Sequence, residues 1–231
     1  MLTESKTNLE IPDGTIALTY DDGPGGHTID IAKFLAEMDV RATFFLIGRL
    51  IERHPTAVKE LIDLGHGVGN HTSSHPHLAN IVRDQGNLVS EVIATDRLIA
   101  KHIGNGPFFF RPPYGEWSPE AARALNGNGD TAKYIGPILW DVDERDWQIG
   151  QWSWGRKWTR ERCQYAYLSQ IKKRGKGVML LHSSCGTAEA SANTMRLNRH
   201  RFELTKGLIP RLKDEGFEFR RLDELLWDPS L

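Results

Sequence analysis

The chain has 231 residues, with 29 Lys and Arg against 30 Asp and Glu and a formal net charge of −1 at pH 7. This length suits one large domain with a substantial core, and the even charge balance gives no footprint for nucleic acid or an anionic membrane surface. We therefore expect a single domain over residues 1–231, with no nucleic acid, no membrane and no protein partner implied. Two cysteines, Cys163 and Cys185, are too few for a secreted disulfide framework, and we expect free thiols.

The first ten residues hold no apolar core of signal-peptide length, and no later stretch approaches about 18 consecutive apolar residues. As written, the sequence predicts a cytoplasmic protein. A chain from which a leader had been removed would read the same way and would be exported.

Strand-like apolar runs alternate with amphipathic helical patterns along the chain. The predicted strands cover residues 15–20, 41–47, 65–70, 107–111, 134–141, 177–181 and 217–221. The predicted helices cover residues 28–39, 56–64, 87–102, 118–126, 159–173 and 199–215, and the segments 147–158 and 184–198 read as insertions. Strict alternation implies parallel strands, in either a closed or nearly closed barrel or an open doubly wound sheet. Because polar clusters follow several strand ends, we favour the (β/α)7 barrel with its site at the C-terminal ends of the strands.

Two acidic residues follow the first predicted strand, and two histidines four positions apart follow the third: Asp21 and Asp22, then His71 and His75. Imidazoles at positions i and i+4 lie on one face of a helical turn, and a carboxylate from elsewhere completes three protein ligands. Three ligands leave coordination positions open for water and substrate, and the second carboxylate can then act as a base. An HxxxH pattern alone often arises by chance, so the placement of both clusters at strand ends is what indicates a catalytic metal site.

Two prolines stiffen the segment after the fourth predicted strand, Arg111-Pro112-Pro113-Tyr114-Gly115. Neither proline has an N–H, so the first free amide is that of Tyr114, held in a rigid turn that suits an oxyanion site. Arg111 could pair with a strand-end carboxylate. The alternative interpretation is a plain proline-rich turn with a surface arginine.

Acids follow the fifth predicted strand, and a histidine follows the sixth. A carboxylate against an imidazole raises the pKa of the imidazole and fixes its tautomer, which suits a general acid that donates to a leaving amine. We predict that Asp146 and His182 form this pair. The alternative is that His182 is only a structural hydrogen-bond partner.

In chain order, these clusters resemble the five motifs of the polysaccharide deacetylase (NodB homology) family, the fourth carbohydrate esterase family. The matching segments run from Thr19 to Pro24, His71 to Pro76, Arg111 to Gly115, Asp143 to Trp147 and Leu180 to His182. The resemblance spans roughly residues 15–183, so residues 1–231 read as a single domain of this family. Tyr20 replaces the usual phenylalanine of the first motif, and Ser183 to Gly186 stand where an acidic residue is frequent.

The resemblance implies a distorted (β/α)7 barrel and metal-dependent removal of N-acetyl, or sometimes O-acetyl, groups from sugars. The implied metal ligands are Asp22, His71 and His75. The implied acid/base groups are Asp21 as base and His182 as acid, oriented by Arg111 and Asp146 respectively. The Tyr114 backbone amide would stabilise the oxyanion together with the metal, and the implied substrate contacts are Trp147, Leu181, Pro113 and Tyr114.

We therefore expect one divalent metal ion, most often Zn²⁺ in such a site, with Co²⁺ or Ni²⁺ as alternatives. The expected partner is an acetylated glycan that contains N-acetylglucosamine, of the chitooligosaccharide or peptidoglycan type. The alternatives are an O-acetylated glycan such as acetylxylan, a small cyclic amide, or a non-catalytic glycan-binding protein on the same fold. The last would normally have lost Asp21 or His182, and neither is lost here.

Several other residues have more ordinary interpretations. His27 reads as a helix-start residue, Ser74 as a hydrogen-bonding support of the site, and Cys185 as a thiol outside the ligand set. The aromatic group Trp147, Trp152, Trp154 and Trp158 forms either a platform for sugar rings or a satellite core.

Overall fold

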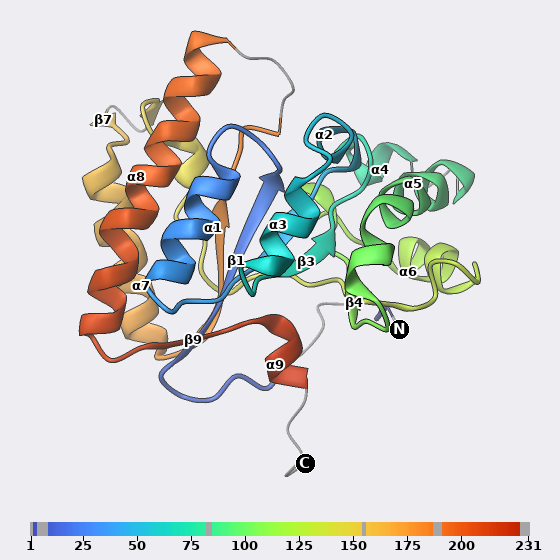
Figure 1. Cartoon of the computed structure of the whole chain (residues 1–231), viewed down its shortest axis with the longest axis horizontal. Coiled ribbons are helices and arrows are strands. Elements are labelled where there is room, and N and C mark those ends of the chain that lie inside the picture. The colour runs from blue at the N-terminus through green and yellow to red at the C-terminus, as the bar shows by residue number, and fades with distance from the viewer. Residues whose placement is uncertain (1, 4–8, 82–84, 154–155, 187–190, 227–231) are drawn as a thin grey trace.

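The computed structural model describes residues 2–3, 9–81, 85–153, 156–186 and 191–226 of the chain (Figure 1). Its main sheet is entirely parallel, with β3 (Gly67–Asn70), β2 (Thr43–Leu46), β1 (Thr15–Gly23) and β8 (Gly177–His182) as neighbours in that order. A fifth strand, β9 (Glu218–Arg220), pairs with the start of β1. The predicted parallel α/β architecture is confirmed.

A second pair of parallel strands, β4 (Phe108–Phe109) and β5 (Tyr134–Ile135), continues the ring. Single bridges join Asn70 to Phe110 and Val142 to Met179, so the segment from β4 to Val142 links β3 to β8. The strands therefore follow one another around an irregular ring. The ring is distorted in this segment because prolines have no N–H to donate to a strand ladder, and prolines precede β4 and follow both β4 and β5.

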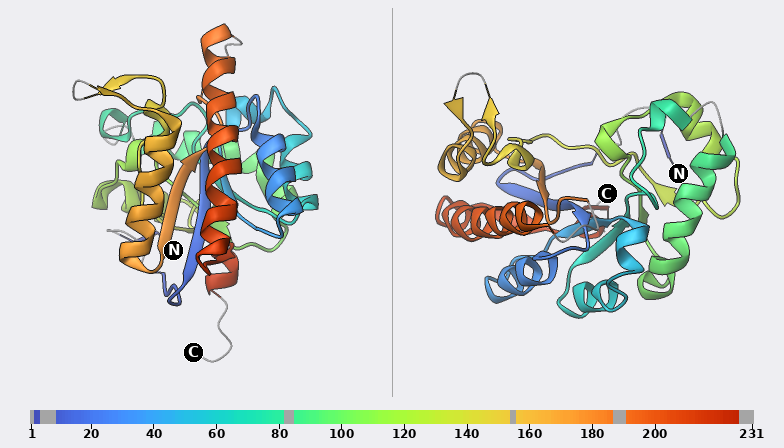
Figure 2. Two further views of the ribbon diagram at one scale, coloured as in Figure 1. Left: turned by 90° about the vertical axis from the view of Figure 1, so that its left-hand side faces the viewer. Right: turned by 90° about the horizontal axis from the view of Figure 1, so that it is seen from above.

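Helices lie outside the strands (Figure 2). The longer ones are α1 (Thr28–Glu37), α3 (Ala57–Asp63), α5 (Gln85–Ile103), α6 (Pro119–Asn126), α7 (Arg160–Arg174) and α8 (Ala192–Asp214). The short elements are α2 (Gly48–Ile51), α4 (Leu78–Ile81), α9 (Leu222–Leu226), the 3₁₀ turns η1 (Pro113–Gly115) and η2 (Asp146–Gln148), and a hairpin of β6 (Trp152–Ser153) and β7 (Arg156–Lys157). No helix in the described part of the chain combines the length and apolar character needed to cross a membrane.

The six predicted helices are all present, and the largest error concerns α8. We predicted an insertion over residues 184–198 and a helix from 199, but α8 begins at Ala192, where the Ser191 side chain accepts a hydrogen bond from the Thr194 N–H. This N-cap stands among polar residues, so no apolar period marked the first two turns. The short helices α2, α4 and α9 were not predicted because one turn is too short to display a period.

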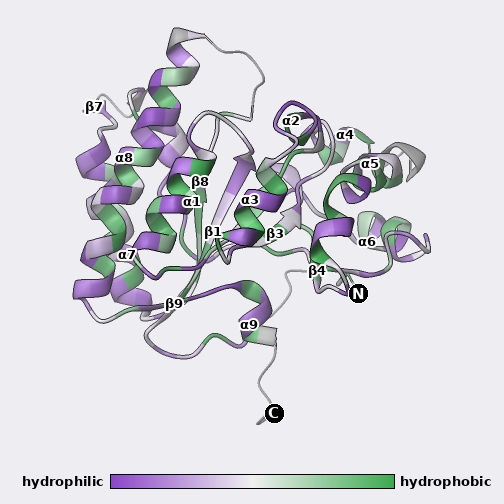
Figure 3. Cartoon of the chain, in the orientation of Figure 1, coloured by the Kyte–Doolittle hydropathy of each residue, from purple (hydrophilic) through white to green (hydrophobic). Residues whose placement is uncertain are grey.

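The two faces of β1 lie in different apolar clusters. Ile16, Leu18 and Tyr20 are fully buried in the larger cluster, together with residues of the surrounding helices. Ala17 belongs to a second cluster with Phe45 and Val178. Since strand side chains alternate between faces, Ala17, Thr19 and Asp21 share the inner face of the ring. Coloured by hydropathy, the helices show apolar and polar bands in alternation (Figure 3), and buried residues of α1 and α8 belong to the larger cluster.

Candidate active site

Asp21 and Asp22 are consecutive, yet both carboxylates lie beside the same imidazole. The Nε2 atom of His71 lies 3.7 Å from Asp21 Oδ2 and 3.6 Å from Asp22 Oδ1. In a regular strand the two side chains would point to opposite faces. Here Asp22 has a φ of 66° and the register of β1 against β2 shifts between Tyr20 and Gly23. This irregular strand end turns the second carboxylate toward the first.

The segment that carries the two histidines is a loop, and the helical turn that we predicted for it is wrong. Thr72 and His75 have positive φ angles of 65° and 59°, which no α-helix contains. The loop is fixed by Glu91 on α5, whose carboxylate accepts hydrogen bonds from the N–H groups of Ser73 and Ser74 and from the Ser74 hydroxyl. The predicted supporting role of Ser74 is confirmed, whereas sequence reasoning missed Glu91, which is distant in sequence.

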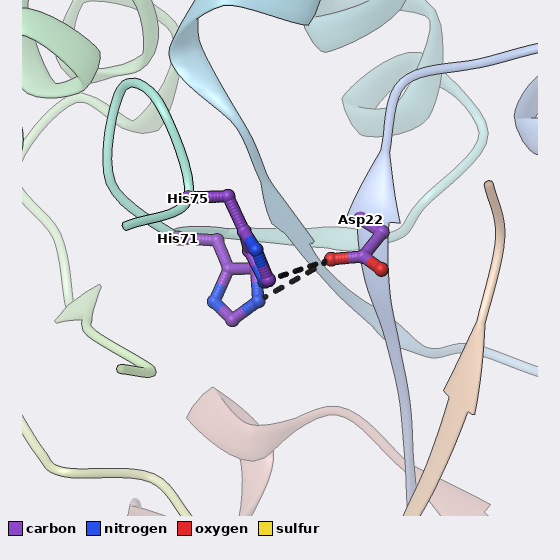
Figure 4. A group of neighbouring side chains, drawn as sticks. All are labelled: Asp22, His71 and His75. Carbon is purple, nitrogen blue, oxygen red and sulfur yellow. Dashed lines mark ion pairs between the residues drawn. The ribbon is translucent and has the colours of Figure 1, made fainter. Parts of the chain in front are cut away.

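Asp22, His71 and His75 place one potential ligand atom each within 4.8 Å of one another (Figure 4). His75 Nε2 lies 3.2 Å from Asp22 Oδ1. That oxygen is buried and has no hydrogen-bond partner among the described residues. A buried oxygen without a partner, facing two ring nitrogens, is what a cation would satisfy. The predicted ligand set therefore fits one divalent metal ion.

The protonation of the three groups suits metal binding. His71 Nδ1 lies 2.8 Å from the Arg111 carbonyl, so Nδ1 carries the proton and Nε2 keeps its lone pair. Burial is the main cause that lowers the pKa of His75 to about 4, which keeps its ring neutral. Burial would raise the pKa of Asp22, but the hydrogen bond of His71 and then the charge of His182 outweigh it and hold that pKa well below its usual range.

Arg111 is fully buried and pairs with Asp21. Its Nη1 donates to Asp21 Oδ1 at 2.7 Å and to the Thr19 hydroxyl at 2.9 Å, and its Nε donates to the Ile138 carbonyl at 2.8 Å. The surface arginine that we considered as the alternative is excluded, and the predicted pairing with a strand-end carboxylate is present. Asp21 is held with one oxygen on Arg111 and the other toward His71.

His182 and Asp146 form the second predicted pair. Asp146 Oδ1 lies 2.6 Å from His182 Nδ1, and its Oδ2 accepts from the His182 backbone N–H at 2.7 Å. Burial would lower the pKa of His182, but the charge and hydrogen bond of Asp146 outweigh it and raise that pKa to about 9. The imidazole is therefore protonated at neutral pH and presents Nε2–H away from Asp146.

Asp21, the metal cluster and His182 line one groove of about 600 Å³, and Arg111 and Asp146 support it from behind. Its walls include Asp21, Asp22, Arg49, His71, His75, Tyr114, Trp140, Asp143, Trp147, Leu180, His182, Cys185, Gly186, Leu197 and Arg201. Trp147 and Tyr114 are the exposed aromatics of this surface, at 42% and 55% exposure. The backbone of Tyr114 is left-handed, with a φ of 57°, and its N–H has no hydrogen bond within the described residues.

Two predicted substrate contacts lie elsewhere. Leu181 is buried in the larger apolar cluster, and Leu180 lines the groove in its place. The reason is the alternation of β8, which puts Leu180 on the inner face with His182 and turns Leu181 outward to the helices. Pro113 is buried in η1 and is absent from the groove wall. Because both residues are leucine, the sequence did not reveal which of the two faces the inside of the ring.

The structure also tests the sequence hypotheses about His27, the cysteines and the tryptophans. His27 precedes α1, where its Nδ1 lies 2.7 Å from Asp30 Oδ2, so the helix-start interpretation is confirmed. Cys185 lies in the groove wall outside the metal cluster, and neither cysteine forms a disulfide. Trp158 packs against the larger cluster, which favours a core role for that residue. Trp154 and the side chain of Trp152 lie outside the described residues.

A family model described as polysaccharide deacetylase matches residues 9–132, and the chain belongs to this family. A peptidoglycan-N-acetylglucosamine deacetylase of Bacillus cereus is 37% identical over 134 residues, covering 58% of this chain and 46% of the relative. A chitooligosaccharide deacetylase of Azorhizobium caulinodans is 29% identical over 214 residues, covering 90% of this chain and 92% of the relative. The chain thus spans less than half the length of the first relative and most of the second.

A solved structure agrees with this membership. The crystal structure of a peptidoglycan N-acetylglucosamine deacetylase superimposes with a TM-score of 0.73 at 27% identity, covering 94% of this chain and 90% of that chain. The resemblance drawn from the five motifs is therefore confirmed, and the α/β fold matches that of a deacetylase.

Proposed function

We propose that the protein is a metal-dependent hydrolase that removes N-acetyl groups from glycans containing N-acetylglucosamine. The observation that carries the proposal is the meeting, in one groove, of the Asp22, His71 and His75 cluster, the Asp21–Arg111 pair and the Asp146–His182 pair. Amide hydrolysis needs an activated water, a polarised carbonyl and a proton for the departing amine, and these three groups supply them. The named activities of the relatives support the same reaction.

A divalent cation bound by Asp22, His71 and His75 would polarise the amide carbonyl and acidify an attacking water. We propose Zn²⁺, because two imidazoles and one carboxylate with open positions form a common catalytic zinc set; Co²⁺ and Ni²⁺ accept the same ligands. Their order of affinity does not select the ion used in the cell.

The residues around the cation divide the proton transfers between two sides of the groove. Asp21, oriented by Arg111, accepts the proton of the attacking water. The Tyr114 N–H is free to donate to the oxygen that gains negative charge. His182, protonated through its contact with Asp146, donates to the leaving nitrogen as the C–N bond breaks. Trp147 supplies an apolar surface in the groove for the acetyl methyl group.

Acetate release from three glycans tests this proposal. Purified protein with zinc should release acetate from chitooligosaccharides and peptidoglycan fragments, and a chelator or the Asp21→Asn substitution should abolish the release. Release from acetylxylan alone would replace the proposal with O-deacetylation. Binding of the glycans by metal-loaded protein without any acetate release would identify a non-catalytic glycan-binding protein.

A further inference from the structure

A second arginine, Arg201 on α8, lines the groove and is almost completely buried, with 5% of its surface exposed. Its Nη1 donates to Cys185 Sγ at 2.7 Å and to Asn198 Oδ1 at 3.2 Å. Its Nε is buried without a hydrogen-bond partner, and no carboxylate in the described part of the chain lies within ion-pair distance of it. Arginine stays charged, and burying an uncompensated charge is costly. Among the residues that the structure describes, Arg201 therefore has no negative partner.

The carboxylates that line the same groove face other groups and not Arg201. Asp21 pairs with Arg111, and Asp22 faces the two metal-site histidines. Asp143 accepts a hydrogen bond from the Arg145 backbone N–H. None of them forms an ion pair with Arg201. A negative charge carried by a molecule that enters the groove would supply the ion-pair partner that Arg201 lacks among the described residues.

Arg49 on α2 reaches the same part of the wall. Its Nη2 donates to the Gly186 carbonyl at 3.0 Å, and Gly186 follows Cys185, the contact of Arg201. Arg49 is exposed and has no ion-pair partner among the residues that the structure describes. Two guanidinium groups from distant helices thus meet on one two-residue stretch of the groove wall.

We propose that Arg201 and Arg49 form an anion subsite that binds a free carboxylate carried by the glycan substrate. The inference rests on the proposed deacetylase function and narrows its substrate class. A carboxylate can accept charge-assisted hydrogen bonds from the guanidinium groups of Arg49 and Arg201, whereas sugar hydroxyls leave the buried charge uncompensated. The substrate class is an acidic glycan, such as a peptide-free strand in which N-acetylglucosamine alternates with its lactyl ether, N-acetylmuramic acid. A neutral chitooligosaccharide offers no carboxylate to this wall.

The test compares one glycan in two charge states. A peptide-free N-acetylglucosamine–N-acetylmuramic acid oligosaccharide is used as the free acid and as its lactyl methyl ester, which has the same sugars without the charge. The zinc-loaded wild type should show a kcat/KM for the acid that exceeds that for the ester by about 10-fold, the effect of one charge-assisted contact. Arg49→Gln and Arg201→Gln should reduce this ratio toward one. The exposed Arg97→Gln on α5, which makes the same charge change outside the groove, should preserve it.

Each other outcome has a definite meaning. Equal kcat/KM values for acid and ester in the wild type would overturn the anion subsite, as would variants that lower both values in the same proportion. The latter result would give Arg201 a purely structural role in holding α8 to the Cys185–Gly186 turn. Because Arg201 is buried, the exposed Arg49 provides the variant that keeps the fold, and thermal unfolding checks both. Failure to release acetate from any glycan would refute the proposed function, while calorimetric binding of acid against ester would still test the subsite.

Discussion

Arg111 and Arg201 are both buried, Arg111 behind the groove residue Asp21 and Arg201 in the groove wall itself, and they differ in the groups to which they donate. Arg111 follows β4 and donates to Asp21, Thr19 and a backbone carbonyl. Arg201 sits on an outer helix and donates to a thiol and an amide oxygen. On the side of the groove that carries Asp21, which we call the catalytic side, the charge of Arg111 is thus paired with a carboxylate, whereas Arg201 has no ion-pair partner among the described residues. We assign the catalytic side to the chemistry of the reaction and the wall around Arg201 to recognition of the glycan.

The strongest test of this division is the Asp21→Asn substitution. It keeps the shape of the side chain and a hydrogen bond to Arg111 but removes the base, so kcat should fall by about 1,000-fold, within the usual contribution of general base catalysis. Acetate release measures the loss, and thermal unfolding confirms the fold. Turnover close to that of the wild type would remove Asp21 from the acid/base pair.

Removing Arg111 should damage the fold itself. Arg111→Ala leaves the Asp21 carboxylate buried and unpaired, which costs about 3–5 kcal/mol in the free energy of unfolding. Arg201→Ala breaks no ion pair within the described part of the chain and should cost clearly less. Urea denaturation of both variants checks the order. Equal losses in the free energy of unfolding would contradict the inference that Arg111 is ion-paired and Arg201 is not.

Zinc affinity tests the metal cluster independently of the acid/base groups on the catalytic side. His75→Ala removes one of three ligands, and the affinity for zinc should fall by more than about 100-fold, since even outer partners of a ligand contribute 10–100-fold. His27→Ala, a histidine paired with Asp30 outside the cluster, is the matched control. Zinc titration by calorimetry measures both. An unchanged affinity in His75→Ala would exclude it as a ligand.

The pH profile tests the second catalytic pair. His182 acts in its protonated form, so the kcat of the wild type should fall as pH rises through about 9. In Asp146→Asn the negative charge that raises the pKa of His182 is gone, and the falling limb should move to lower pH. The raised pKa also stabilises the fold fully below pH 6.5, and this stabilisation is lost as pH rises through about 9. An unmoved limb in the variant would assign the titration to another group.

The sequence predicted which residues meet on the catalytic side of the groove. Asp21, His71, Arg111 and His182 each follow an apolar run, and polar side chains at the ends of parallel strands must converge. It failed where backbone conformation decides the outcome. Nothing in the residue types at Thr72 and His75 signals positive φ angles, so a helical turn was predicted where a loop is held by Glu91.

Long-range packing also lay beyond the sequence. Arg201 occupies an ordinary position in an amphipathic helix, and its burial follows only from the packing of α8 beside α7, α1 and η2. In β8 the apolar run covers both faces, so Leu180 and Leu181 could not be told apart until their register against β1 was known. The alternation of side chains along a strand identifies the buried face only where polar residues mark the opposite face.

The central claim is that Asp22, His71 and His75 hold one divalent cation beside Asp21. A crystal structure of the zinc-loaded protein, with anomalous scattering measured at the zinc edge, tests it most directly. The claim predicts a single ion about 2.0–2.2 Å from Asp22 Oδ1 and from the Nε2 atoms of both histidines, the usual zinc–ligand distances. An anomalous peak at any other group of side chains, or none in the groove, would contradict it.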